Sequence, residues 1–278
     1  MTDVRTFYWH DRVKGRRKLF WDKYVKKRKS AWKDFAIGNA GDIFARNLVS
    51  YFYPGANPVN VKDGPRILCV GSIGHKLQPG DVLSGIGCKT TELPSKHAPD
   101  VMVHGLRGPI SFDAYKAAGF DVSRVAWLAD PGLLIAKMLK PAKAKPGRVS
   151  FIPHYREREE IRKLMPAGMK IIDIDDDPLS VGKSIQKSEL IYTSSLHGAV
   201  FAHALDRPVV LIKPATEEPL LKYEDYYLAV GLGKPVMLDS IIDADFATAP
   251  NSPASLTLDI DTISFPAEAT LREKGILL

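Results

Sequence analysis

The stretch LIYTSSLHGAVFAHALDRPVVLI, residues 190–212, decides the fold class of this 278-residue chain. Residues 190–193 are apolar and rich in strand-forming side chains, which predicts a strand. Residues 196–205 predict a helix and residues 208–212 a second strand. Because so short a strand–helix–strand span forms a βαβ unit with parallel strands, the chain is expected to be an α/β protein.

The same alternation continues through most of the chain. Further strands are expected at residues 66–70, 101–104, 125–128, 149–152 and 170–174, and further helices at residues 43–52, 112–118, 157–164 and 179–187. A Pro-, Lys- and Ala-rich stretch, residues 140–147, interrupts the run and suits an exposed linker. Two such runs predict two doubly wound, Rossmann-like domains that face each other across a cleft, in a GT-B-like α/β fold.

This organisation divides the chain into five parts. They are a basic, aromatic-rich N-terminal segment (1–35), a first Rossmann-like domain (36–140), a linker (141–147), a second Rossmann-like domain (148–245) and a C-terminal tail or helix (246–278). A hydrophobic content of 45% is enough to bury a full core.

Cysteine content and hydropathy bear on the compartment. The two cysteines, Cys69 and Cys88, make no disulfide framework, which favours a reducing environment. No apolar run approaches the roughly 18 to 20 residues that span a bilayer, and the N-terminus lacks the pattern of a secretory signal. A cytoplasmic location is therefore expected.

The basic charge is concentrated at the N-terminus. Residues 1–35 hold twelve Lys/Arg and four Asp, a formal +8, so the other 243 residues carry −1 of the total +7. Three of the four tryptophans, Trp9, Trp21 and Trp32, lie in the same segment. Aromatic rings among basic residues suit an anionic membrane surface, although they also suit nucleic acid or ordinary packing onto the domain. The neutral remainder argues against nucleic acid, which usually requires basic charge along a groove.

Polar groups stand directly after several expected strands, where ligands bind in doubly wound sheets. Ser194 or Ser195 can cap the helix that follows residues 190–193, and free N–H groups at a helix start form an anion site. His197 lies in the first turn of that helix, where it can hydrogen-bond an anion and exchange a proton near neutral pH. The alternative is a capped helix whose histidine bonds a backbone carbonyl.

Other post-strand residues are weaker candidates. Arg107 offers a planar fork for a carboxylate or phosphate, or else forms a salt bridge between loops. His75 and His154 stand in equivalent positions, and residues 175–177, three consecutive Asp, are expected in a solvated turn. The sequence contains no Walker-type or dinucleotide-binding glycine motif, no metal-ligand spacing and no nucleophile elbow.

Taken together in chain order, these and neighbouring residues make the chain resemble the polysaccharide pyruvyltransferases, which place pyruvate ketals on bacterial cell-surface sugars. The matching motifs, in chain order, are Asn39-Ala-Gly-Asp42, Gly71-Ser-Ile-Gly74, Arg107-Gly-Pro109, Asp130-Pro-Gly-Leu-Leu134, Pro153-His-Tyr155, Ser194-Ser-Leu-His-Gly198 and Lys222-Tyr-Glu-Asp-Tyr-Tyr227. They cover about residues 36 to 230. The last motif and the compact length look most like the exopolysaccharide branch, of the xanthan and succinoglycan type, which acts on lipid-linked oligosaccharides.

The resemblance implies that phosphoenolpyruvate is the donor, with no further cofactor and no metal. Catalysis would fall to His197 and Arg107. The residues expected to bind phosphoenolpyruvate are Arg107, Ser194, Ser195, Leu196, His197, His154 and Ser72. Those expected at the acceptor site or elsewhere in the cleft are Asn39, Asp42, His75, Asp130, Lys222 and Tyr223. The sequence departs from the family at Gly71-Ser-Ile-Gly74, where many members have a run of glycines.

The implied activity is transfer of pyruvate to a sugar of a lipid-linked exopolysaccharide unit. An enzyme of this kind would lie peripherally on the inner face of the bacterial cytoplasmic membrane, with residues 1–35 against anionic lipid. One alternative is a GT-B glycosyltransferase that uses a nucleotide sugar. The other is a non-catalytic protein that binds a membrane surface through residues 1–35.

Overall fold

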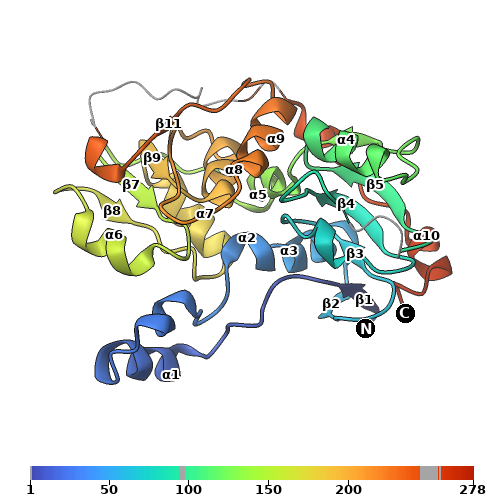
Figure 1. Cartoon of the computed structure of the whole chain (residues 1–278), viewed down its shortest axis with the longest axis horizontal. Helices are drawn as coiled ribbons and strands as arrows, with labels where there is room; N and C mark the ends of the chain where they lie inside the picture. The colour runs from blue at the N-terminus through green and yellow to red at the C-terminus, as the bar shows by residue number, and fades with distance from the viewer. Residues whose placement is uncertain (1, 94–97, 245–255, 257) are drawn as a thin grey trace.

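The computed structural model describes residues 2–93, 98–244, 256 and 258–278. The chain forms two wholly parallel sheets with helices packed around them (Figure 1). The predicted α/β class with Rossmann-like sheets is confirmed. We call the part around the first sheet the first unit and the part around the second sheet the second unit.

The first unit contains six strands in the order β2-β1-β3-β4-β5-β6. Their bounds are β1 Asp3–Thr6, β2 Asn57–Asn60, β3 Ile67–Leu68, β4 Val82–Ile86, β5 Met102–Leu106 and β6 Trp127–Leu128. The sequence did not indicate β1, β2 or β4. The first two are short and polar, and β4 contains a glycine, so none has the continuous apolar pattern of a buried parallel strand.

The second unit contains five strands in the order β11-β10-β9-β7-β8. Their bounds are β7 Val149–Ile152, β8 Lys170–Ile171, β9 Leu190–Thr193, β10 Val209–Ile212 and β11 Met237–Leu238. The βαβ unit expected at residues 190–212 is confirmed, with helix α8 (Leu196–Ala204) between β9 and β10. Every residue of α8 from Leu196 to His203 is buried, which explains its apolar sequence.

The other α-helices are short. They are α1 Arg16–Phe20, α2 Ala40–Ile43, α3 Ala45–Phe52, α4 Pro109–Ala117, α5 Ile135–Met138, α6 Arg158–Leu164, α7 Pro178–Gln186, α9 Leu221–Ala229 and α10 Glu268–Glu273. Asn39 caps α2 as expected, because its side chain accepts a hydrogen bond from the Gly41 N–H. Within the described ranges, no helix has the length and apolar character to cross a membrane.

Both ends of the chain meet at the first sheet. Strand β1 lies between β2 and β3, and residues 276–278 run beside it, with hydrogen bonds from Arg5 N–H to Ile276 O (2.8 Å) and from Leu278 N–H to Asp3 O (2.9 Å). The predicted first domain begins at residue 36, whereas β1 (Asp3–Thr6) belongs to the sheet of that domain. Residues 245–255 and 257, around the start of the expected tail, lie outside the described residues.

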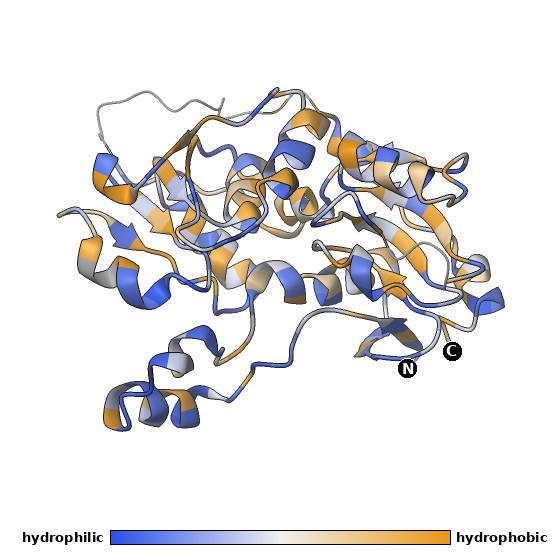
Figure 2. Ribbon diagram, viewed as in Figure 1, coloured by the Kyte–Doolittle hydropathy of each residue, from blue (hydrophilic) through white to orange (hydrophobic). Residues whose placement is uncertain are grey.

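The two units share one apolar core. It joins Val4 and Ile67 of the first sheet to Ile152 and Leu211 of the second, and Figure 2 shows the apolar strands inside a more polar periphery. A buried ion pair adds a polar link, because the Arg107 Nε lies 3.0 Å from an Asp225 carboxylate oxygen. The cavity described below is therefore bounded by two units that pack directly against each other.

The expectation of a solvated turn at residues 175–177 is wrong for Asp175. Its carboxylate accepts hydrogen bonds from the backbone N–H groups of residues 36–38 and pairs with Arg158 at 3.2 Å. Its side chain is only 6% exposed. The reason is tertiary, since the segment that leaves the N-terminal region crosses the end of this turn, a contact that local sequence cannot indicate.

Candidate active site

Each sheet has a point at which the strand order reverses. In the first sheet the chain passes from β1 outward to β2 and then resumes on the other side of β1 with β3. In the second sheet it passes from β7 to β8 and resumes on the other side of β7 with β9. Loops that follow the strands at such a reversal splay apart and open a crevice for ligands.

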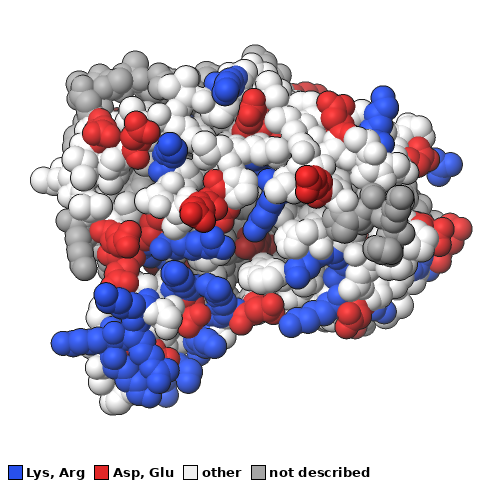
Figure 3. Space-filling model, in the orientation of Figure 1, with Lys and Arg blue, Asp and Glu red and all other residues white. Residues whose placement is uncertain are grey.

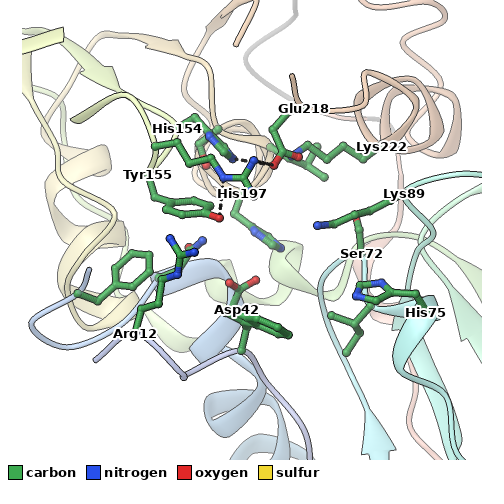
Figure 4. A pocket seen from close by; sticks show the side chains of 17 residues that line it. Arg12, Asp42, Ser72, His75, Lys89, His154, Tyr155, His197, Glu218 and Lys222 are labelled. Carbon is green, nitrogen blue, oxygen red and sulfur yellow. Dashed lines mark hydrogen bonds and ion pairs between the residues drawn. The ribbon is translucent and has the colours of Figure 1, made fainter. Parts of the chain in front are cut away.

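Loops from both reversal points line a single cavity, which encloses about 200 Å³ (Figure 4). This is room for a small metabolite, since one water molecule occupies about 30 Å³ in the liquid. The lining residues are Trp9, Arg12, Phe35, Asn39, Asp42, Ser72, Ile73, His75, Lys89, His154, Tyr155, Arg156, Ser195, Leu196, His197, Glu218 and Lys222.

His197 occupies the centre of this cavity. Its ring points into the open space between Asp42 and Lys89 in Figure 4. The buried Nε2 atom has no hydrogen-bond partner among the described residues. The ring packs so closely on Gly41 that a Cβ there would lie 2.1 Å from Nδ1. Glycine at position 41 is therefore required for His197 to take this position.

The start of α8 lies beside His197. Ser195 caps the helix by accepting the Gly198 N–H at 3.4 Å, and Thr193 Oγ1 accepts the Ser195 N–H at 3.0 Å. The N–H groups of the first helical turn and the helix dipole make this end favourable for an anion. The predicted capping of this helix by Ser194 or Ser195 is confirmed for Ser195.

A buried charge cluster forms the second-unit wall of the cavity. Glu218 accepts a hydrogen bond from the Lys222 ammonium at 3.0 Å, and its carboxylate lies 3.7 Å from His154 Nε2 and 3.5 Å from Arg156. Burial lowers the pKa of His154 to about 3, so this imidazole is neutral at physiological pH. Burial also lowers the pKa of Lys222, against the attraction of Glu218. These contacts hold the wall in a fixed arrangement.

Asp42 is the other carboxylate in the cavity. Burial raises its pKa, opposed by the positive charge of His197, Lys222 and Lys89. A carboxyl with a raised pKa can keep a proton at a pH where an exposed aspartate has lost it. The Asp42 carboxyl and the His197 ring thus lie on facing sides of the same small space.

The first-unit wall is more open. Lys89 follows β4, His75 follows β3, and Trp9 and Arg12 follow β1. Lys89 and Arg12 are exposed, and among the described residues no carboxylate pairs with either of them. Burial, together with Lys89 and Lys76, lowers the pKa of His75. This wall presents cations that are available to a ligand.

Nine of the thirteen residues predicted for the site line the cavity: Ser72, Asn39, Asp42, His75, His154, Ser195, Leu196, His197 and Lys222. The other four, Arg107, Asp130, Ser194 and Tyr223, are buried and do not line the cavity. In the part of the chain that the structure describes, no three His, Cys, Asp or Glu side chains are grouped as metal ligands would be.

Arg107 does not reach the cavity, contrary to the expectation that it holds the anion. Its guanidinium is fully buried, pairs with Asp225, and donates hydrogen bonds to Ser72 Oγ (2.6 Å) and Cys88 O (3.0 Å). These three partners hold the guanidinium in place. Of the three, only Ser72 lines the cavity, so Arg107 acts on the cavity by positioning Ser72. The salt-bridge alternative considered for this arginine describes the geometry better than the anion clamp, although the partner Asp225 lies in helix α9 and not in a loop.

Ser194, Tyr223 and Asp130 have supporting contacts. Ser194 Oγ accepts the His154 N–H at 2.8 Å and donates to Glu157 at 2.5 Å, and Tyr223 donates to the Ser194 carbonyl at 2.6 Å. Asp130 accepts the Gly132 N–H at 2.8 Å and caps the turn after β6. The first two hold the loops after β7 and β9 together beneath the cavity.

Eight lining residues were not predicted: Trp9, Arg12, Phe35, Ile73, Lys89, Tyr155, Arg156 and Glu218. Some carried a signal. Glu218 stands four residues before Lys222, a spacing that suits an ion pair, and Tyr155 is the last residue of the family motif Pro153-His-Tyr155. Arg12 and Lys89 could not be recognised, because the strands that position them, β1 and β4, were not apparent.

Comparison with known proteins identifies sequence relatives. The sequence model of the polysaccharide pyruvyl transferase family matches residues 3–215, which begins at β1 and ends after β10. Uncharacterized protein L143 of Acanthamoeba polyphaga mimivirus is 27% identical over 245 residues, 80% of this chain and 82% of that protein. Succinoglycan biosynthesis protein ExoV of Rhizobium meliloti (strain 1021) is 28% identical over 213 residues, 70% of this chain and 62% of that protein. No solved structure matches.

Proposed function

Because the chain belongs to the polysaccharide pyruvyl transferase family, we propose that it transfers pyruvate from phosphoenolpyruvate to a sugar of a lipid-linked exopolysaccharide unit. The product is a cyclic ketal, and phosphate is released. The observation that carries the proposal is the position of His197, with a free buried Nε2 at the start of α8, among Lys and Arg side chains. The two units act as GT-B-like halves around one site.

The reaction adds one proton to C3 of phosphoenolpyruvate and removes one proton from each of two sugar hydroxyls. A proton added to C3 of phosphoenolpyruvate gives C2 oxocarbenium character, and a sugar hydroxyl then bonds to C2. The C2–O bond to phosphate breaks, and a second hydroxyl bonds to C2 to close the ring. Of the two hydroxyl protons lost, one replaces the proton delivered to C3 and the other leaves with phosphate.

Groups in the cavity match these needs. His197 serves as the acid that protonates C3 and as the base for a hydroxyl that bonds to C2, with Asp42 opposite it as a second proton-carrying group. Lys222, Lys89 and the first turn of α8 bind the phosphate and carboxylate. Arg107 contributes by fixing Ser72 rather than by touching the donor.

The acceptor sugar lies on the side formed by residues from the N-terminal region. Trp9 and Arg12 are beside the open part of the cavity, and Tyr155 lies next to Phe35 at a ring distance of 5.4 Å. Aromatic faces pack against the C–H face of a sugar ring, while the guanidinium donates to its hydroxyls. The two hydroxyls can then approach C2 from this side.

The test is phosphate release from phosphoenolpyruvate with lipid-linked acceptors, together with mass spectrometry of the product for one added pyruvate less one water. We expect wild-type protein to form the ketal and His197→Ala to lose it while keeping its circular dichroism spectrum. His104→Ala is the matched control, because His104 lies near Ser264 outside the cavity. Wild-type transfer by His197→Ala, or release of a nucleoside diphosphate from a nucleotide sugar instead, rejects the proposal.

A further inference from the structure

Residues 14–34 form a separate projection that we call the basic knob. It contains α1, a π-helical turn (Trp21–Val25) and a 3-10 turn (Lys29–Lys33), and it extends away from both sheets at the lower left of Figure 1. Ten Lys/Arg and two Asp give these residues a formal charge of +8, whereas the rest of the chain carries −1. In Figure 3 the blue side chains gather on this projection.

The knob also exposes apolar side chains. Phe20, Trp21, Tyr24 and Val25 are 61%, 53%, 50% and 49% exposed. Eleven large apolar side chains of the described residues are at least 40% exposed, and the other seven lie outside the knob. Positions 20, 21, 24 and 25 fall within one arc of a helix, and the Phe20 and Tyr24 rings lie 5.0 Å apart, so the exposed apolar side chains share one side of the knob.

The base of the knob is part of the cavity wall. Lys14 N–H donates to Phe35 O at 2.9 Å, and Phe35 N–H donates to Arg12 O at 2.9 Å. These two hydrogen bonds join the start of the knob to its end. Arg12 and Phe35 both line the cavity. The segment that follows the knob is held by Asp175, whose carboxylate accepts hydrogen bonds from the backbone N–H groups of residues 36–38. The knob is thus attached directly beside the cavity.

We infer that the basic knob docks on an anionic lipid bilayer and holds the cavity opening at the membrane surface. Rings of Trp, Tyr and Phe lie at headgroup depth in such surfaces, and exposed Lys/Arg attract anionic lipids. The confinement of the charge to one knob argues for a surface rather than for a nucleic acid strand, which requires charge continued along a groove. Only the identity of the presented lipid-linked sugar rests on the proposed function.

The first test is co-sedimentation of the full chain with vesicles of phosphatidylcholine, alone or mixed with phosphatidylglycerol. We expect binding to the mixed vesicles only, and release at about 1 M salt, where the Debye length is about 3 Å. Charge reversal by Arg17→Glu, Lys26→Glu and Lys29→Glu together is expected to weaken binding at least tenfold. A control with Lys116→Glu, Lys143→Glu and Lys183→Glu makes the same charge change at exposed sites of the body and is expected to bind as wild type.

Contact with the bilayer is tested by quenching of tryptophan fluorescence with brominated lipid. Trp21 is the most exposed tryptophan, so wild type is expected to be quenched and Trp21→Phe to lose most of the quenching while still binding. Equal weakening by the body control, unchanged quenching in Trp21→Phe, or tighter binding to a single-stranded oligonucleotide than to vesicles overturns the inference. Neither measurement uses phosphoenolpyruvate. Failure of membrane binding can therefore be distinguished from failure of the proposed pyruvate transfer.

Discussion

The two walls of the cavity differ in how their charges are held. On the second-unit wall, Lys222 and His154 are buried and both face Glu218. On the first-unit wall, Lys89 and Arg12 are exposed and pair with no carboxylate of the described residues. A fixed, desolvated cluster can stabilise charge that develops in a reaction, because it needs no reorganisation at that moment. Mobile exposed cations suit the binding of ligands that vary in shape.

The sharpest test of this difference replaces one lysine on each wall. Lys222→Met is expected to lower kcat/KM for phosphoenolpyruvate by about 10²–10³-fold, as loss of a preorganised charged donor does. Lys89→Met is expected to lower it by about fivefold, because an exposed charge contributes up to about 1 kcal/mol. Steady-state kinetics on both variants measure the two effects. Equal losses would show that the walls contribute alike, contrary to their burial.

The His197 ring can be displaced from the cavity centre by a substitution at Gly41, without changing His197 itself. Gly41→Ala places a Cβ 2.1 Å from its Nδ1, so the ring must leave the centre of the cavity. A displacement of about 1 Å costs on the order of 10²-fold in rate. The double variant Gly41→Ala/His197→Ala supplies the control, since it should be no slower than His197→Ala alone. Additive losses would mean that Gly41 acts through some other residue.

The buried histidine of the second-unit wall makes stability depend on pH. The pKa of His154 is about 3 in the folded protein, against about 6.5 for an unperturbed histidine. Between these values the unfolded chain binds a proton that the folded chain does not, so the free energy of unfolding falls as pH decreases from 6.5. From pH 7 to pH 5 the loss from this residue is about 2 kcal/mol.

Urea unfolding at both pH values measures this loss. His154→Gln is expected to flatten the dependence by about that amount. His75→Gln is the counterpart on the first-unit wall. It is expected to have a smaller effect, because His75 is exposed whereas His154 is buried. A larger change for His75→Gln than for His154→Gln would contradict the contrast between the walls.

The sequence indicated the second-unit wall somewhat better than the first, and the reason is physical. Strand β9, the Ser195 cap and α8 are adjacent in the chain, so their pattern is local. Strand β1 instead obtains its place from pairing with residues 57–60 and Ile67, more than fifty positions away. Arg12 and Trp9 follow that strand and could not be recognised without it.

Arg107 shows the opposite error. Its motif is conspicuous, and its position after β5 was correct. The direction of its guanidinium depends on Asp225, 118 positions later in the chain, which pairs with it and turns it away from the cavity. Local sequence can therefore place a residue at the correct end of a strand without showing whether its charge faces the ligand or the protein interior.

The smallest expected effect concerns Arg12, where the first-unit wall meets the basic knob. Arg12→Ala removes an exposed cation that contacts a bound ligand equally before and during reaction, so we expect about a fivefold rise in KM for a soluble acceptor and an unchanged kcat. Arg16→Ala, four residues along in the knob and outside the cavity lining, is the matched control and is expected to leave both constants unchanged. A fall in kcat for Arg12→Ala would mean that this wall also stabilises the transition state, and the division between a fixed reactive wall and an adaptable binding wall would then fail.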